Sequence, residues 1–445
     1  MTELLQKVRV IDPVSKIDEL FDVLIADGYI QEVASHITDI SPDTPIRDCR
    51  GLVIGPGLVD LYSHSGEPGF EERETLLSLL QSATAGGFTR ISILPNTSPA
   101  IDNPALVAQL QQKKAEGQRS MAGTHNAGRG GRGAEENLSP LLPCSPAPLL
   151  HIWGAITLDV AGKQMTELAD LASAGVVGFS DGKPLENLAL VRRVLEYVQP
   201  LGKPVAFWPS DRQLAANGVM REGPDALRFG LPPIPASAET TAIAAMLELV
   251  ATIGTPVHIM RVSTSRSVEL IASAKAAGLP ITASTTWMHL LLDTKAIKSY
   301  NTSLHLEPPL GNPSDVAALR AGVRAGVIDA IVIDHTPYSY EEKVQAFAEA
   351  PPGAIGLELA LPLLWQYLVE TEEFTALELW RALSISPAEC LGQKVSAILP
   401  HQPAELTLFD PQQTWKVERK SLYTLSQNTP WLGQQMKGHV VQTWR

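Results

Sequence analysis

The chain has 445 residues, 44% of them hydrophobic, and carries a formal net charge of −13 at pH 7. This length suits one large domain, such as an α/β barrel of ~250 residues, with a smaller domain beside it. The negative charge argues against binding to nucleic acid or to anionic membranes, and no apolar stretch reaches the ~18 residues of a membrane span. Three scattered cysteines and an N-terminus without a signal pattern indicate a cytoplasmic protein without disulfides.

Apolar runs that favour strands alternate with amphipathic helical stretches along most of the chain. Such alternation is typical of repeated βα units and a parallel sheet. Helices are expected at 239–253 and 315–325, between these runs. The strand-like runs include residues 52–59, 176–180, 204–208, 256–260, 279–283 and 330–334, and the two ends add 8–13, 22–28 and 404–410.

One segment, at about 115–148, interrupts this pattern. It contains a Gly/Arg-rich run at 127–133 and a Pro-rich run at 140–148. Composition of this kind is typical of a flexible, solvated insertion loop. A loop that docks a partner or binds an anion is the alternative, but Gly-rich runs outside a strand-turn-helix setting are weak signals.

The residues that follow the apolar run 52–59 carry the first chemical signal. Positions i and i+2 of a strand point to the same face, so a His-x-His sequence here would aim two imidazoles at one metal ion. This chain has Tyr62 and His64 at those places. A phenol is a poor ligand unless ionised, and its reference pKa is about 10.

Residues 60–69 resemble the Asp-x-His-x-His-x-Arg-Glu-Pro-Gly pattern of dihydroorotases in the cyclic amidohydrolase superfamily. Tyr62 stands at the first metal-binding His, and Gly66 stands at the Arg that holds the substrate carboxylate. The sequence at 95–99, Pro-Asn-Thr-Ser-Pro, is also similar and places Asn96 at a substrate-contacting position.

This resemblance implies an architecture. In the family, a (β/α)8 TIM barrel carries a small β domain built from both ends of the chain. We therefore expect the barrel at 56–394 and a small β-sandwich domain formed by 1–55 and 395–445.

The resemblance also implies a metal site. Hydrolysis of a cyclic amide needs a metal that activates water and a carboxylate that moves the proton. In the family, two metal ions are held by four His, a bridging carboxylate or carboxylated Lys, and an Asp. Here Asp334 stands at the catalytic acid/base position and Asp181 at a possible acidic ligand, whereas Trp208 and Arg261 replace His ligands. A guanidinium stays protonated and would repel a divalent ion.

Three functions are compatible with these residues. The first is a noncatalytic dihydroorotase-like chain of pyrimidine biosynthesis without a cofactor, which assembles with aspartate transcarbamoylase or with itself. The second is an active dihydroorotase with a reduced zinc site at His64, Asp181 and Asp334. The third is a module that binds an anionic metabolite against Arg261, with Asn96 as a further contact.

Each candidate also has a structural interpretation. His64 and Asp334 could form a polar pair in the barrel mouth, because buried polar groups commonly satisfy each other. Trp208 would fill the core and Asp181 would cap the helix that follows it. If the metal is absent, we predict that the Arg261 guanidinium occupies part of its site and contacts Asp334. The remaining histidines considered, His258, His289 and His335, are expected to be structural.

Overall fold

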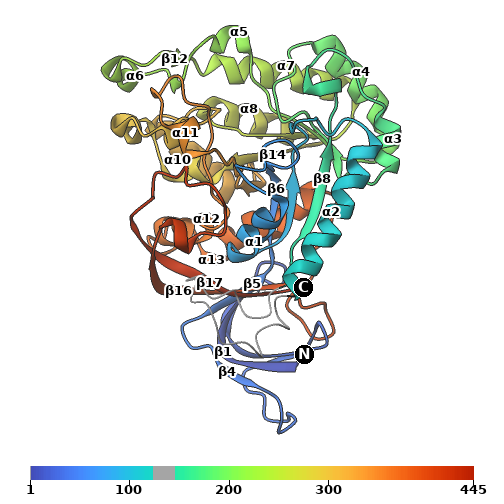
Figure 1. Cartoon of the computed structure of the whole chain (residues 1–445), viewed down its shortest axis with the longest axis vertical. Coiled ribbons are helices and arrows are strands. Elements are labelled where there is room, and N and C mark those ends of the chain that lie inside the picture. Colours follow the sequence, from blue (N-terminus) through green and yellow to red (C-terminus); the bar gives the residue numbers. More distant parts are fainter. Residues whose placement is uncertain (1, 124–145) are drawn as a thin grey trace.

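The centre of the protein is a barrel of parallel strands, seen in the upper part of Figure 1. The computed structural model describes residues 2–123 and 146–445. Its eight-stranded sheet has the order β15-β14-β13-β10-β9-β8-β7-β6, and all its ladders are parallel. The expected (β/α)8 barrel is therefore confirmed. The strands are β6 (Leu58–Ser63), β7 (Phe88–Ile93), β8 (Leu149–Gly154), β9 (Gly178–Phe179), β10 (Val205–Phe207), β13 (Val257–Ile259), β14 (Ile281–Thr286) and β15 (Ala330–Val332).

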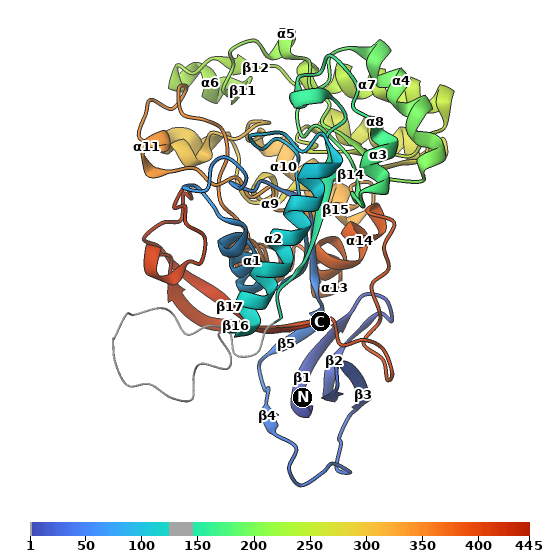
Figure 2. The same ribbon diagram turned by 45° about the vertical axis from the view of Figure 1, so that its right-hand side comes forward.

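Helices follow the strands and cover the outside of the barrel (Figure 2). They are α1 (Leu76–Ala85), α2 (Pro104–Gly123), α3 (Leu168–Ser173), α4 (Leu188–Val198), α5 (Arg212–Ala215), α6 (Pro224–Phe229), α7 (Ser237–Ile253), α8 (Ser265–Ala276), α9 (Trp287–Leu291), α10 (Pro313–Arg324), α11 (Tyr340–Lys343), α12 (Ala360–Leu364), α13 (Ala376–Trp380) and α14 (Ser386–Cys390). A short two-stranded sheet, β11 (Met220–Arg221) with β12 (Pro233–Ile234), lies between α5 and α7 in the sequence.

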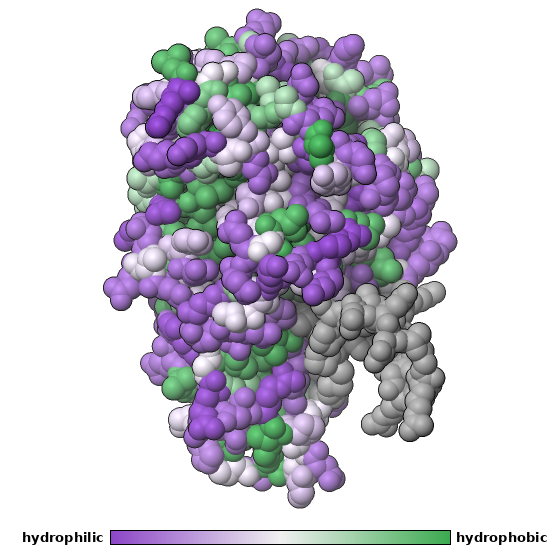
Figure 3. All heavy atoms as spheres, turned by 60° about the vertical axis from the view of Figure 1, so that its left-hand side comes forward, coloured by the Kyte–Doolittle hydropathy of each residue, from purple (hydrophilic) through white to green (hydrophobic). Residues whose placement is uncertain are grey.

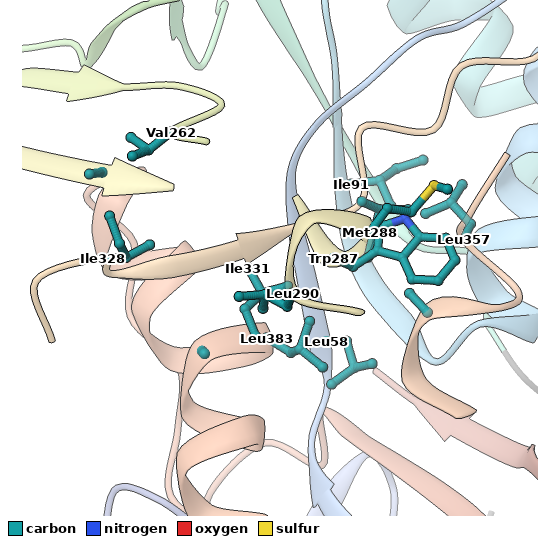
Figure 4. Close-up of a cluster of buried hydrophobic side chains, with 14 of the residues drawn as sticks. Leu58, Ile91, Val262, Trp287, Met288, Leu290, Ile328, Ile331, Leu357 and Leu383 are labelled. Atoms are coloured by element: carbon teal, nitrogen blue, oxygen red, sulfur yellow. The ribbon is translucent and has the colours of Figure 1, made fainter. Parts of the chain in front are cut away.

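The helix α4 shows why these segments fold as they do. The Asn187 side chain accepts hydrogen bonds from the first backbone amides and so caps the helix. Apolar residues then recur at helical spacing, and this stripe is buried: Leu190, Val191, Val194, Leu195 and Val198. Figure 4 shows another part of the same core, where Trp287 and Met288 of α9 lie near Ile91 and Leu357.

Side chains and loop backbone close the barrel between β15 and β6. The Asp60 carboxylate accepts a hydrogen bond from the Ile333 amide at 2.8 Å, and the His64 amide donates to the His335 carbonyl at 2.8 Å. Burial raises the pKa of Asp60 to about 7, although Ser63 and backbone amides donate hydrogen bonds to it. Asp60, the first residue of the family-like motif, thus joins the two end strands.

Both ends of the chain enter one seven-stranded sheet, which lies below the barrel in Figure 1. Its order is β17-β16-β5-β1-β2-β3, and β4 pairs with β1. The domain boundaries at 55/56 and 394/395 stay predictions. The strands are β1 (Thr2–Asp12), β2 (Ile17–Ala26), β3 (Tyr29–Ala34), β4 (Ile46–Asp48), β5 (Val53–Pro56), β16 (Leu406–Lys416) and β17 (Gln435–Trp444).

The position of β5 orients the barrel. Because β5 directly precedes β6, the amino end of β6 adjoins the terminal sheet, and the carboxyl ends of the parallel barrel strands face away from it (Figure 1). Chemistry in such barrels is placed at the carboxyl ends.

The predicted insertion at 115–148 is only partly a loop. Its first residues extend α2 to Gly123, because Ala, Gln, Lys and Glu at 105–116 are good helix formers. The Gly/Arg run at 127–133 lies outside the described residues, as does most of the Pro-rich run.

The face of the protein shown in Figure 3 is predominantly polar. Figure 3 shows hydrophilic side chains over most of one face, with apolar side chains in separate patches. Among the described residues, none of the helices is long and apolar enough to cross a membrane.

Candidate functional site

A pocket of about 230 Å³ opens at the carboxyl ends of the barrel strands. Loops after β6, β7, β9, β10, β13, β14 and β15 contribute to its walls. The pocket brings together most of the residues singled out from the sequence, namely His64, Asn96, Trp208, Arg261 and Asp334. The lining also includes the charged or ionisable residues Arg73, Lys183, Arg212, His289, Glu307 and Tyr338, and the hydroxyl residues Ser65, Thr286 and Thr336.

Arg261 and Asp334 form a two-pronged ion pair at the floor of this pocket. Nε donates to one carboxylate oxygen at 2.8 Å and Nη2 to the other at 2.6 Å. The arginine is only 4% exposed and the aspartate 14%. Burial opposes ionisation of Asp334, but the Arg261 charge and the hydrogen bonds from Arg261 lower the pKa of the carboxyl far below its ordinary value. The predicted contact is confirmed.

The same guanidinium also reaches the surviving histidine. Arg261 Nη2 lies 3.2 Å from His64 Nε2, and Nη1 donates to the Gly182 carbonyl at 3.1 Å. Burial lowers the pKa of His64, so the ring is neutral near pH 7 and Nε2 can accept from Arg261. His64 Nε2 lies 3.7 Å from Asp334 Oδ1, and Arg261 Nη2 donates hydrogen bonds to both atoms. The expected histidine–carboxylate pair is therefore a triad with Arg261.

Two aromatic residues, Tyr62 and Trp208, enclose the guanidinium. The Arg261 Cζ atom lies 4.6 Å from the Trp208 ring centroid and 5.7 Å from that of Tyr62. Aromatic faces attract a cation, most strongly when both are desolvated. Trp208 is buried as expected for a core residue, but its neighbours include this charge.

A series of hydrogen-bonded polar side chains leads from the Tyr62 hydroxyl into the barrel. It accepts a hydrogen bond from the Arg261 backbone amide at 3.1 Å and lies 2.9 Å from the Ser284 hydroxyl. Ser284 also contacts His258 Nε2 at 2.8 Å, and His258 Nδ1 contacts Thr282. Burial lowers the pKa of His258 to about 3, so the His258 ring in this series of hydrogen bonds is neutral near pH 7. No sequence motif had pointed to Ser284.

Asp181 does not join this group. Its carboxylate accepts three hydrogen bonds, from the amides of Ile156 and Thr157 and from the Thr157 hydroxyl, at 2.6–3.0 Å. It does not cap a helix either, since α4 begins later and has Asn187 as its cap. Both interpretations of Asp181 are wrong, because the carboxylate turns back to bind the loop that follows β8.

Residues that could hold zinc are therefore missing from this site. Zinc requires three or four nitrogen, sulfur or oxygen ligands around one point. In the part of the chain that the structure describes, no three His, Cys, Asp or Glu side chains are grouped in this way. The space next to His64 and Asp334 is occupied by the Arg261 guanidinium. The residues present do not fit the metal centre of an amidohydrolase.

The substrate side of the pocket has also changed. Asn96 lines the pocket and makes no hydrogen bond to any described residue. At Gly66, where the family has Arg, a Cβ atom would lie 2.4 Å from the carbonyl oxygens of both Phe70 and Glu74. The turn at 66–74 therefore leaves no room for a larger side chain, and the substrate arginine could return only if this turn were rebuilt.

The other histidines have structural partners. His335 is fully buried, with Nδ1 accepting from the Gly356 amide and Nε2 lying 3.3 Å from Glu74. His289 contacts Thr286 and the Pro309 carbonyl, although it also lines the pocket. Burial lowers the pKa of His289 to about 4.

Comparison with known proteins places this site in a family. Residues 232–445 match the model of the "Amidohydrolase family". A "Probable dihydroorotase-like protein" from Synechocystis sp. is 45% identical over 450 residues, covering 99% of both chains. A "Dihydroorotase" from Pelobacter propionicus is 38% identical, and the match covers 100% of this chain and 98% of the relative. The chain belongs to the dihydroorotase family of amidohydrolases. Its fold also matches the L-hydantoinase of Arthrobacter aurescens, with a TM-score of 0.80 at 20% identity over 100% of this chain and 94% of the other.

Family membership confirms the relationship inferred from residues 60–69. The differences from the family pattern at the site occur in a chain that matches these two relatives over 98–99% of their length. The sequence identified Tyr62, Trp208 and Arg261 as the replaced positions. It did not identify the Gly182 carbonyl as a partner of Arg261 or the closed turn at Gly66.

Proposed function

We propose that this chain is a noncatalytic dihydroorotase-like protein of pyrimidine biosynthesis that serves as a structural partner of aspartate transcarbamoylase. The observation that carries the noncatalytic part is the Arg261 guanidinium, which binds both oxygens of Asp334 and contacts His64. A fixed positive charge stands where a family enzyme needs a metal ion.

The chemistry explains why this arrangement does not support turnover. Asp334 could act as a base only by taking a proton, and the ion pair with Arg261 keeps its pKa far below neutrality. An arginine stays protonated and cannot generate hydroxide from water at neutral pH. The pocket also lacks the substrate arginine at position 66. The active alternative at His64, Asp181 and Asp334 has little support, because Asp181 is bound to Thr157 instead.

Turnover can be measured directly. The purified full chain should neither hydrolyse dihydroorotate nor cyclise N-carbamoyl-aspartate, with or without added zinc. The matched control is the dihydroorotase of Pelobacter propionicus, purified and assayed in the same way, which is 38% identical to this chain. Turnover comparable with that control, retained in repeated purifications and lost in Asp334→Asn, would refute the proposal.

The partnership is the second part of the proposal. Its support is that the barrel and the terminal sheet are complete while the metal ligands are replaced, so assembly is a role that the intact fold can still perform. The tagged chain and aspartate transcarbamoylase of the same organism should coelute in size exclusion at micromolar concentration and low salt. Separate elution, with this chain running as a homo-oligomer, would favour self-association instead.

A further inference from the structure

Two further hollows adjoin the candidate site on the side of α4 and α7. The first, which we call the cationic hollow, has a volume of about 430 Å³. Its lining residues are Val160, Ala161, Gly162, Lys163, Asp181, Lys183, Pro184, Glu186, Asn187 and Arg212. The apolar hollow, about 360 Å³, is lined by residues of 185–188, 207–213 and 241–246. Both contain Glu186, so they meet at this residue. The helices α4, α5 and α7 lie at the end of the molecule away from the terminal sheet (Figures 1 and 2).

The cationic hollow has a surplus of positive charge, with three cationic side chains and two carboxylates in its lining. Lys163, Lys183 and Arg212 are exposed, and none forms an ion pair with any residue in the described ranges. Two carboxylates share the hollow. Asp181 is 2% exposed and turned toward the backbone of residues 156–157, whereas Glu186 is exposed at the junction. Three accessible cations in a chain of net charge −13 indicate an anionic ligand.

Apolar side chains form much of the wall of the apolar hollow. Phe207, Trp208 and Met246 are buried beneath it, and Leu188 is 47% exposed at its edge. Ser210, Gln213 and Thr241 add polar groups around these apolar side chains. Asp211 also lines the hollow, but its carboxylate caps α5. Apolar walls with a few polar groups are the usual composition of a small-molecule site.

We propose that the two hollows together bind a nucleotide. The base would pack in the apolar hollow against Phe207 and Trp208, and the phosphate would bind Lys163, Lys183 and Arg212. Glu186, which lines both hollows, stands where the carboxylate can accept hydrogen bonds from the ribose hydroxyls. Each hollow falls within the ~300–1,000 Å³ of typical ligand pockets. This site shares Trp208, Lys183 and Arg212 with the lining of the first pocket, but it uses neither Asp334 nor His64.

The test is isothermal titration calorimetry of the full chain with uridine 5′-monophosphate and adenosine 5′-monophosphate. At least one should bind, and its nucleoside and inorganic phosphate alone should each bind at least about tenfold more weakly, because each occupies one hollow. Binding should weaken as salt rises. If neither nucleotide binds, or if phosphate alone binds as tightly, the proposal is wrong.

Variants separate these hollows from the candidate site. Lys163 and Ala245 line only the two hollows, whereas Lys183 and Arg212 also line the first pocket. Lys163→Glu should weaken binding at least about tenfold by reversing a charge beside the phosphate. Ala245→Phe should abolish it by filling the apolar hollow. Lys298→Glu, an exposed lysine outside all three pockets, should leave it unchanged. Equal affinity in Lys163→Glu and the native chain would place the nucleotide elsewhere.

Discussion

The ion pair between Arg261 and Asp334 gives the sharpest test of the site. Arg261→Met removes the guanidinium and keeps an unbranched side chain that can pack between Tyr62 and Trp208. The Asp334 carboxylate, 14% exposed, then has the His64 imidazole 3.7 Å away in place of a two-pronged partner. The double variant Arg261→Met with Asp334→Asn also removes the negative charge.

The expected magnitude follows from burial. Breaking a buried ion pair from one side costs ~3–5 kcal/mol, because the remaining charge loses its partner. We expect ~3 kcal/mol for Arg261→Met, at the lower end, because Asp334 keeps some access to water and can take up a proton. Asp334→Asn should also destabilise the chain, by leaving the arginine buried without a counter-charge. The double variant should then recover ~1–2 kcal/mol of the summed loss, a coupling typical of contacting charges.

Urea unfolding at pH 7, followed by tryptophan fluorescence, measures these changes. The matched control is Arg192→Met, which breaks an exposed pair with Glu196 on α4. That variant should lose no more than ~0.5 kcal/mol, since exposed i,i+4 pairs contribute little. If the two single changes add to within ~0.5 kcal/mol in the double variant, the residues are not coupled and the reasoning fails.

Two other outcomes are expected. Because the described residues contain no group of three metal ligands, neither a chelator nor added zinc should shift the Tm of the purified chain, and a rise in Tm with zinc would contradict this. Burial raises the pKa of Glu358 to about 7, against hydrogen bonds from the amides of Thr424 and Tyr423. The native state therefore holds a proton that the unfolded chain releases near pH ~4.3, so the free energy of unfolding should fall between pH ~4.3 and about 7 by up to ~4 kcal/mol. Glu358→Gln should flatten this part of the stability profile, and an unchanged slope would show that other groups cause it.

The sequence was sufficient for the fold and for part of the site. The resemblance to dihydroorotases predicted the barrel. The alternation of strand-like and helical segments predicted its parallel βα units, and charge compensation predicted that Arg261 would pair with Asp334. The prediction of βα units depends on the spacing of apolar residues along the chain, and the prediction of the ion pair depends on the signs of the side-chain charges. They do not require the exact path of any loop.

The features that the sequence did not predict depend on loop geometry. Asp181 was assigned to a metal or a helix cap, but its carboxylate binds the amides after β8. The closed turn around Gly66 arises from the carbonyl positions of Phe70 and Glu74. Contacts of this kind depend on where the backbone groups of a loop lie, and side-chain type alone does not determine them.

The backbone at the ion pair shows how two barrel strands bring Arg261 and Asp334 together. Arg261 and Asp334 both have left-handed conformations, with φ of 55° and 51°, which are uncommon for residues other than glycine. Each follows the end of a barrel strand, β13 or β15, and the two side chains meet. Such conformations cost ~1–3 kcal/mol each and persist where surrounding contacts determine them. An anionic site of this shape needs a positive charge at its centre. Arginine can supply it from the chain itself, because its planar fork matches both oxygens of a carboxylate, which the point charge of a lysine does not.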